Sequence, residues 1–192
     1  MKKLAVSAFV VVAIVQWMIP ANMIWEKNKT LVRGEVFKFA TAPVDPTHPF
    51  IGKYVHLDFN EAHSSFPAAG DYKSGETIYV VYKKDKKGYA QVAGISRTKP
   101  STHNYLQAKV NYINSINNEQ TLFFQLPFNR FYMEEYKAPR AEKLYLERSP
   151  DTTNKTYALV SLFDGDAVIK DVFINDTSIS TLLKVREEPR KD

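Results

Sequence analysis

The chain has 192 residues, a formal net charge of +5 and an apolar content of 44%. This apolar content is close to the globular average, which excludes both a disordered chain and a protein with many membrane spans. The chain contains no cysteine, so disulfide bonds, thiolate zinc sites and cysteine nucleophiles are also excluded.

The first predicted element is an apolar helix at the N-terminus. Residues 4–24 contain no charged side chain, and a helix of this length would extend about 31 Å, which matches the hydrocarbon core of a bilayer. Because Lys2 and Lys3 precede the segment, the positive-inside rule keeps residues 1–3 in the cytoplasm and sends the rest across the membrane. The alternative is a cleaved signal peptide, although residues 19–21 match a cleavage site poorly. We therefore predict a single-pass transmembrane signal anchor.

The remainder of the chain predicts one domain that is rich in strands. A juxtamembrane segment, residues 25–33, leads into a domain over residues 34–182, and a charged tail, residues 183–192, follows. The sequence contains 11 Tyr and 12 Phe against 7 Gly, and this excess of aromatic residues favours strands. Alternation of apolar and polar residues predicts strands at residues 35–41 and 53–60. Strand-forming runs bounded by turn sequences predict further strands at residues 77–83, 89–95, 104–113, 119–126, 156–163 and 167–174.

Turn sequences and two helical segments complete the predicted architecture. Residues 85–88 and Asp164-Gly165-Asp166 are typical of β-hairpin turns. Residues 130–136 and 140–148 are the two body segments with a helical apolar face. Because the turns are short and no βαβ rhythm is present, we predict a mainly β fold. It is an antiparallel barrel or sandwich of about eight strands with one or two short helices, preceded by the N-terminal transmembrane helix.

Two short motifs lie close together in the first part of the domain. Pro43-Val44-Asp45-Pro46 precedes Gly52-Lys53-Tyr54, and Leu57 and Phe59 follow. This arrangement resembles the core of the bacterial GDYxxLxY family, whose signature is Gly, an acidic residue and Tyr, then Leu and an aromatic ring. Lys53 replaces the acidic residue and Phe59 replaces the final Tyr. The first replacement argues against a mechanism that needs an acid at that position.

The resemblance extends over most of residues 20–175. Arg130-Phe131-Tyr132-Met133-Glu134 is similar to a later element of the family. Together with the predicted anchor, the resemblance implies a protein of the bacterial inner membrane, with its C-terminal domain in the periplasm. It also implies a multi-pass membrane protein as partner, but it supplies no established activity.

The predicted binding site consists of Asp45, Gly52, Tyr54, His56 and Arg130. Asp45, Tyr54 and His56 are expected to line a groove that receives a peptide or ligand. Gly52 opens a strand after a proline-rich turn, where positive φ or a close backbone approach is expected. The alternative is a purely structural motif, in which the Tyr54 ring packs and its hydroxyl group bonds a neighbour.

Glu134 and Glu142 are the best acid/base candidates in the sequence. Two carboxylates that converge in a cleft can hydrolyse a glycosidic bond, whereas carboxylates beside basic residues can simply be solvated charges. No pair of histidines has the His-x-His or His-x-x-x-His spacing of a metal site, and no cofactor or RNA-recognition motif is present. We therefore expect no metal, no cofactor and no nucleic-acid partner.

Three functions are consistent with these patterns. The favoured one is a non-enzymatic accessory or binding domain for an integral membrane protein of the cell envelope, with membrane lipid around residues 4–24. The second is a membrane-tethered hydrolase that uses Glu134 and Glu142. The third is an envelope ligand sensor with its pocket at the mouth of the barrel.

Overall fold

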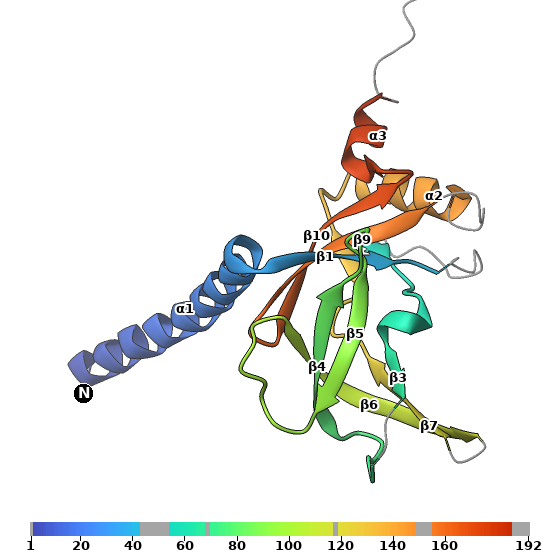
Figure 1. Cartoon of the computed structure of the whole chain (residues 1–192). Helices are drawn as coiled ribbons and strands as arrows, with labels where there is room; N and C mark the ends of the chain where they lie inside the picture. Colours follow the sequence, from blue (N-terminus) through green and yellow to red (C-terminus); the bar gives the residue numbers. More distant parts are fainter. Residues whose placement is uncertain (1, 43–53, 68–69, 117–118, 149–154, 186–192) are drawn as a thin grey trace, which may run out of the picture.

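The described part of the chain forms three β-sheets and three α-helices (Figure 1). The computed structural model describes residues 2–42, 54–67, 70–116, 119–148 and 155–185, without the side chains of residues 2–5, 7, 8, 10, 62, 116, 119 and 185. The strands are β1 (Glu35–Ala40), β2 (Tyr54–His56), β3 (Ser65–Pro67), β4 (Thr77–Lys84), β5 (Ala90–Ser96), β6 (Tyr105–Ile116), β7 (Glu119–Gln125), β8 (Arg130–Tyr132), β9 (Thr156–Phe163), β10 (Asp166–Ile174) and β11 (Thr177–Ser178). The helices are α1 (Lys2–Arg33), the short 3₁₀ helix η1 (Glu61–His63), α2 (Ala138–Arg148) and α3 (Ile179–Val185).

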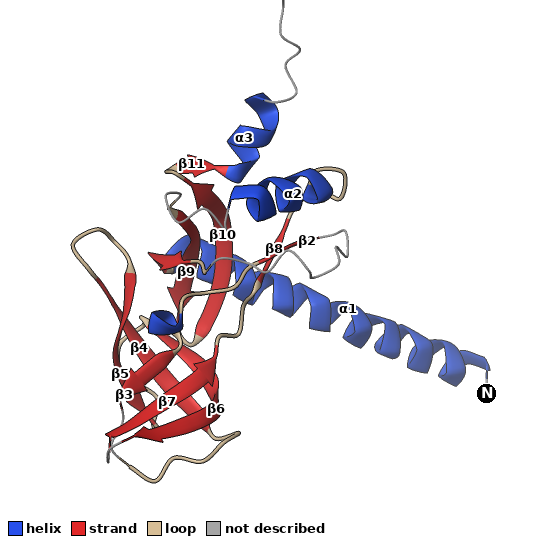
Figure 2. Ribbon diagram, turned by 90° about the vertical axis from the view of Figure 1, so that its right-hand side faces the viewer, coloured by secondary structure: helices blue, strands red, loops and turns tan. Residues whose placement is uncertain are grey.

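The two larger sheets approach each other closely and nearly close into a barrel (Figure 2). The first has the order β1-β9-β10-β11, the second has the order β3-β7-β6-β4-β5, and β2 pairs with β8 alone. All of these strand pairs are antiparallel. The sheets meet where Lys38 N donates a hydrogen bond to the Gly88 carbonyl at 3.0 Å, and where Gln107 N donates to the Gly165 carbonyl at 3.1 Å. The prediction of a mainly β, antiparallel domain is therefore confirmed.

The β9–β10 hairpin forms where its turn sequence predicts it. Asp164 and Gly165 have φ angles of 55° and 93°, so both lie in the left-handed region that a two-residue type I′ turn needs. Phe163 and Asp166 pair directly on either side of these two residues. The turn therefore sets the register of β9 against β10.

Residues 130–136 do not form the predicted helix. Residues 130–132 form β8 instead, in which Phe131 is buried and its two neighbours are exposed, an alternation that suits a strand. Helix α2 begins later, at Ala138, where Pro139 lies in the first turn and removes no backbone donor that the helix needs. The other predicted helix, residues 140–148, is confirmed as part of α2.

Phe39 of β1 lies at the centre of the core and links the two larger sheets. Its side chain is fully buried, and its ring centroid lies 6.0 Å from that of Phe59, 5.1 Å from His63, 5.3 Å from Tyr82 and 5.2 Å from Phe128. These four rings come from three separate segments of the chain, because Phe59 and His63 are only four residues apart. One side chain therefore holds together parts of the fold that are distant in sequence.

Helix α1 extends away from the β body, and its last turns contact β9 and β10 (Figure 1). Lys27 Nζ lies 2.5 Å from Asp166 Oδ1, and Ser161 Oγ donates a hydrogen bond to the Thr30 carbonyl at 2.7 Å. The predicted membrane-spanning segment, residues 4–24, lies within α1. Over the part of the chain that the structure describes, no helix has the length and apolar character needed to cross a membrane.

Candidate functional site

The two-stranded sheet β2–β8 brings together three of the predicted site residues. Tyr54 pairs with Tyr132, and His56 pairs with Arg130. Because alternate residues of a strand share a face, these four side chains lie on one face, which we call the β2–β8 face. On the opposite side, Phe131 and its pairing partner in β2 are buried in the core.

Arg130 is held on the β2–β8 face by an aromatic ring rather than by a carboxylate. Its guanidinium carbon lies 4.7 Å from the centroid of the Tyr54 ring, and the Tyr54 and Tyr132 rings meet edge to face at 5.6 Å. No acidic side chain among the described residues forms an ion pair with Arg130. The neighbouring His56 pairs instead with Asp58, at 3.3 Å. Stacking leaves the planar edge of a guanidinium available to bind an anion.

A cavity of about 550 Å³, the β8–β10 cavity, adjoins this face. Its basic and polar lining comes from Lys27 in the last third of α1, from Asn129, and from Arg130 and Tyr132 of β8. Its apolar lining comes from Pro127, Phe128, Ala167, Val168 and Ile169. The cavity therefore combines cationic and polar lining residues, which we call its rim, with apolar lining residues, which we call its wall. Its volume lies within the usual range of small-molecule sites.

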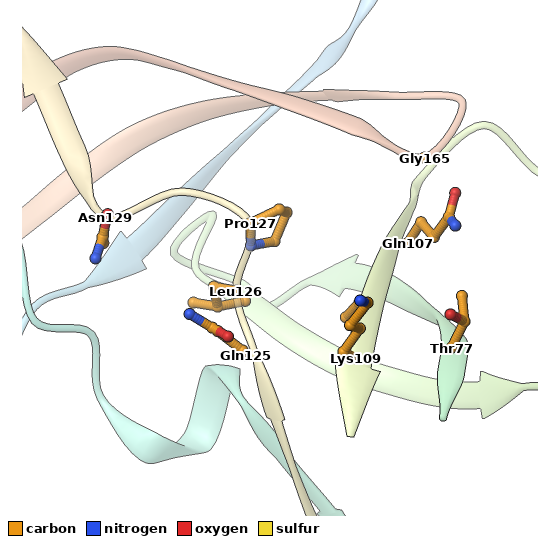
Figure 3. A pocket seen from close by; sticks show the side chains of 9 residues that line it. Thr77, Gln107, Lys109, Gln125, Leu126, Pro127, Asn129 and Gly165 are labelled. Carbon is orange, nitrogen blue, oxygen red and sulfur yellow. The ribbon is translucent and has the colours of Figure 1, made fainter. Parts of the chain in front are cut away.

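A second cavity, the β6–β7 cavity, lies on the other side of the segment that connects β7 to β8. Figure 3 shows Thr77, Gln107 and Lys109 on one side of it and the segment from Gln125 to Asn129 on the other. Its volume is about 520 Å³, and it shares Pro127 and Asn129 with the β8–β10 cavity. Thr77, Gln107, Gln125 and Asn129 give it neutral amide and hydroxyl groups, and Lys109 is its one cation. Its lining is therefore less apolar and less cationic than that of the β8–β10 cavity.

Glu142 lies under the β2–β8 sheet rather than in either cavity. It belongs to the buried side of α2, which packs against β2, and it is only 8% exposed. Burial raises the pKa of the Glu142 carboxyl group, while the charge of His56 and its backbone N–H oppose this rise. The second carboxyl oxygen, Oε2, has no hydrogen-bond partner among the described residues. Ionised Glu142 is therefore a source of instability in the fold.

We expect Glu142→Gln to raise the melting temperature at pH 7. The raised pKa means that Glu142 contributes to stability below the pKa of the unfolded chain, about 4.3, and that this contribution is lost as the pH rises through the higher folded-state value. Glutamine stays neutral and can still accept the His56 N–H, so its advantage should grow from pH 4 to pH 8. Thermal unfolding followed by circular dichroism measures this difference.

The control for this comparison is Glu147→Gln on the same helix, where the carboxylate is exposed and lies 3.9 Å from Lys143. We expect little change at any pH, since exposed ion pairs contribute about 0–1 kcal/mol. An unchanged or lower melting temperature for Glu142→Gln throughout this pH range would contradict the role assigned to Glu142.

Glu134, the other acid/base candidate, has a different environment. Its side chain is exposed and lies 2.9 Å from Lys137 Nζ. Hydrogen bonds from Tyr136 and Lys137 lower the pKa of the Glu134 carboxyl group. No hydrogen bond or ion pair in the described part of the chain joins Glu134 to Glu142. The two carboxylates thus lie in unlike surroundings, one solvated and one buried.

Two predicted site residues remain, and the buried His63, which was not predicted as a site residue, has a structural role. Asp45 and Gly52 lie outside the described residues. His63 is buried, and its Nε2 accepts the Ala40 N–H at 2.9 Å, so it supports the fold. The described residues contain no group of three or more His, Asp or Glu side chains that could hold a metal ion.

Sequence reasoning missed Lys27, Asn129, Tyr132 and the wall formed by residues 167–169. Tyr132 lies two residues after Arg130 in the segment that resembles the family, and this spacing on one strand face is the signal that could have identified it. Lys27 is the first basic residue after the uncharged N-terminal segment. The apolar wall gave no signal of its own, because apolar residues of a strand usually face the core.

Comparison with known proteins gives one match. The sequence model of a family described as "GDYXXLXY protein" matches residues 16–172, a range that contains both strands of the β2–β8 face. Within the signature, Leu57 is buried, and Phe59 packs edge to face on Phe39 and Phe128, so these two positions serve the core. No curated protein and no solved structure matches the chain.

Proposed function

Because the chain belongs to the GDYXXLXY protein family, we propose that it is a membrane-anchored binding domain of the bacterial cell envelope. In this proposal α1 crosses the inner membrane through residues 4–24 and holds the β domain in the periplasm. The domain then serves as an accessory or binding partner of a multi-pass membrane protein.

One observation carries the proposal: the apolar side chains of α1 are exposed on every side of the helix. Trp17, Met18 and Ile19 are 78%, 64% and 61% exposed, and consecutive helical residues point about 100° apart. A helix of a soluble domain exposes one polar face instead. An apolar surface of this extent needs a cover, and the uncharged sequence of residues 4–24 favours lipid as that cover.

The charges at the two ends of the segment support the proposed orientation. Lys2 and Lys3 precede the uncharged residues 4–24, and the β domain follows them. Since positive residues next to a span are retained in the cytoplasm, the β domain would lie on the opposite side.

We expect the full chain to stay in the membrane pellet after an alkaline carbonate wash and the double variant Val12→Asp/Ile14→Asp to leave it. An aspartate at the centre of a membrane helix costs roughly 2.5–3.5 kcal/mol, so two of them should abolish stable insertion. Protease added to spheroplasts should digest the β domain of the wild-type chain, which tests its side of the membrane.

The matched control is Val32→Asp, since Val32 is an apolar residue of the same helix that is 75% exposed and lies beyond the proposed span. This variant should stay in the pellet. A wild-type chain that is released by the wash, or a β domain that protease reaches only after lysis, would overturn the proposed anchoring.

The partner role has a separate test. A photo-reactive amino acid at Met18, inside the proposed span, should crosslink to a multi-pass membrane protein in intact cells, whereas the same group at Lys143 on α2 should not. If Met18 crosslinks to lipid alone at every expression level, the accessory role is wrong while the anchoring proposal stands.

A further inference from the structure

We propose that the β8–β10 cavity binds the headgroup of an anionic phospholipid from the membrane that holds α1. This inference rests on the anchoring proposed above and adds a ligand to it. It follows from three observations: the charge at the rim of the cavity, the apolar wall behind the rim, and the position of the cavity along the axis of α1.

Among the residues that the structure describes, no carboxylate forms an ion pair with the guanidinium group of Arg130, one of the residues that line the cavity. Arg130 contacts the Tyr54 ring and no described carboxylate, whereas Lys27, on the same rim, is paired with Asp166. A planar guanidinium matches two oxygens of a phosphate group better than an ammonium does. The Asn129 side chain on this rim adds a neutral donor. The rim is therefore suited to a phosphodiester.

The wall behind the rim is apolar and comes mainly from β10. Ala167, Val168 and Ile169 line it together with Phe128. A free inorganic anion would gain nothing from such a wall, whereas the glycerol and the first methylene groups of a phospholipid would bury apolar surface against it. The β6–β7 cavity is of similar size, 520 Å³ against 550 Å³, but polar and apolar surface share its lining about equally and Lys109 is its one cationic lining residue, so the β8–β10 cavity is both more apolar and richer in cations. Of the two cavities, the β8–β10 cavity fits an amphiphile.

The position of the cavity along α1 agrees with the depth of lipid headgroups. Lys27 lines the cavity and lies three residues after Ile24, the last residue of the proposed span. Three helical residues advance about 4.5 Å along the axis. The headgroup layer on each side of a bilayer is roughly 5–8 Å thick. A phospholipid in the outer layer of the membrane would therefore meet the rim without leaving the bilayer.

The test uses the full chain in maltoside micelles. It is titrated with phosphatidylglycerol, with phosphatidylcholine of the same acyl chains, and with glycerol phosphate, and bound molecules are counted by native mass spectrometry. We expect phosphatidylglycerol to bind more tightly than the other two. Arg130→Gln should weaken phosphatidylglycerol binding at least about tenfold, because it removes a charge-assisted contact. Val168→Trp, which fills the apolar wall, should weaken it as well.

The control is Lys109→Gln in the β6–β7 cavity. Like Arg130→Gln it removes one positive charge, but from the neighbouring cavity, so it should leave phosphatidylglycerol binding unchanged. Circular dichroism of each variant shows whether it is folded. Equal binding of the two phospholipids, or equal loss in Lys109→Gln and Arg130→Gln, would overturn the proposed site. Glycerol phosphate that binds as tightly as phosphatidylglycerol would overturn the lipid assignment. None of these results affects the carbonate-wash test, so the two proposals fail separately.

Discussion

Replacing Phe39 with alanine should destabilise the protein by about 3–5 kcal/mol, the usual cost of removing a buried aromatic side chain. The ring is fully buried and meets Phe59, His63, Tyr82 and Phe128 at centroid distances of 5.1–6.0 Å. Its loss leaves a cavity where the two larger sheets join. Since a domain of this size has a total free energy of unfolding of roughly 5–15 kcal/mol, the substitution would remove a large fraction of that stability. Chemical denaturation followed by far-ultraviolet circular dichroism measures the change.

A comparison with Tyr112→Ala separates the position of Phe39 from the loss of any aromatic ring. Tyr112 stacks on Phe123 at 4.5 Å, but its side chain is 48% exposed and lies on β6, away from the junction of the sheets. We expect this variant to lose less than about 1.5 kcal/mol, the range measured for aromatic pairs. Equal losses for the two variants would show that Phe39 has no special place in the core.

Gly34→Ala should also destabilise the protein, although it adds only one methyl group. A Cβ atom at this position would overlap Ser161 Oγ and the Thr30 carbonyl oxygen, and it would lie 2.9 Å from the Leu162 carbonyl oxygen. Backbone atoms cannot move aside as a flexible side chain can. Relief of the overlap would require the end of α1 to separate from β9. We expect a loss of about 1–3 kcal/mol or more, the cost of overpacking a rigid site.

Two measurements identify the cause of this loss. Thermal unfolding reports the lower stability, and trypsin cleavage after Arg33 should become faster if the end of α1 has left β9. Gly94→Ala is the control, because a Cβ atom at Gly94 meets nothing within 4 Å. A Gly34→Ala chain that unfolds and is cleaved like Gly94→Ala would mean that α1 does not depend on this close approach.

Local patterns accounted for most of the elements of this fold. The apolar and β-branched residues of 156–163 and 167–174 and the left-handed pair Asp164-Gly165 act through neighbouring residues, so the hairpin could be predicted without knowledge of any distant contact. β8 could not be predicted in this way. It has three residues, and it is a strand because it pairs with β2, far earlier in the chain. The sequence offered only a weak helical pattern in its place.

Some features of the candidate site could likewise be recognised from the sequence, whereas others depend on the folded chain. Tyr54, His56 and Arg130 were recognisable because they stand in or near family motifs. Their common face required the β2–β8 register, and the cavity beside it required α1 to dock on the β9–β10 hairpin. Glu142 illustrates the limit most clearly: its sequence context suggests a charged surface residue, and the packing of α2 against β2 buries it.

The sequence by itself determined the family, the mainly β character and the uncharged N-terminal segment, since each depends on composition, spacing or short-range sterics. Only the tertiary structure decided which side chains meet. Strand register and helix docking arise from contacts between distant segments, and periodicity shows that a face is apolar without showing what covers it. For this reason the Arg130 rim and its β10 wall became visible as one site only in the folded chain.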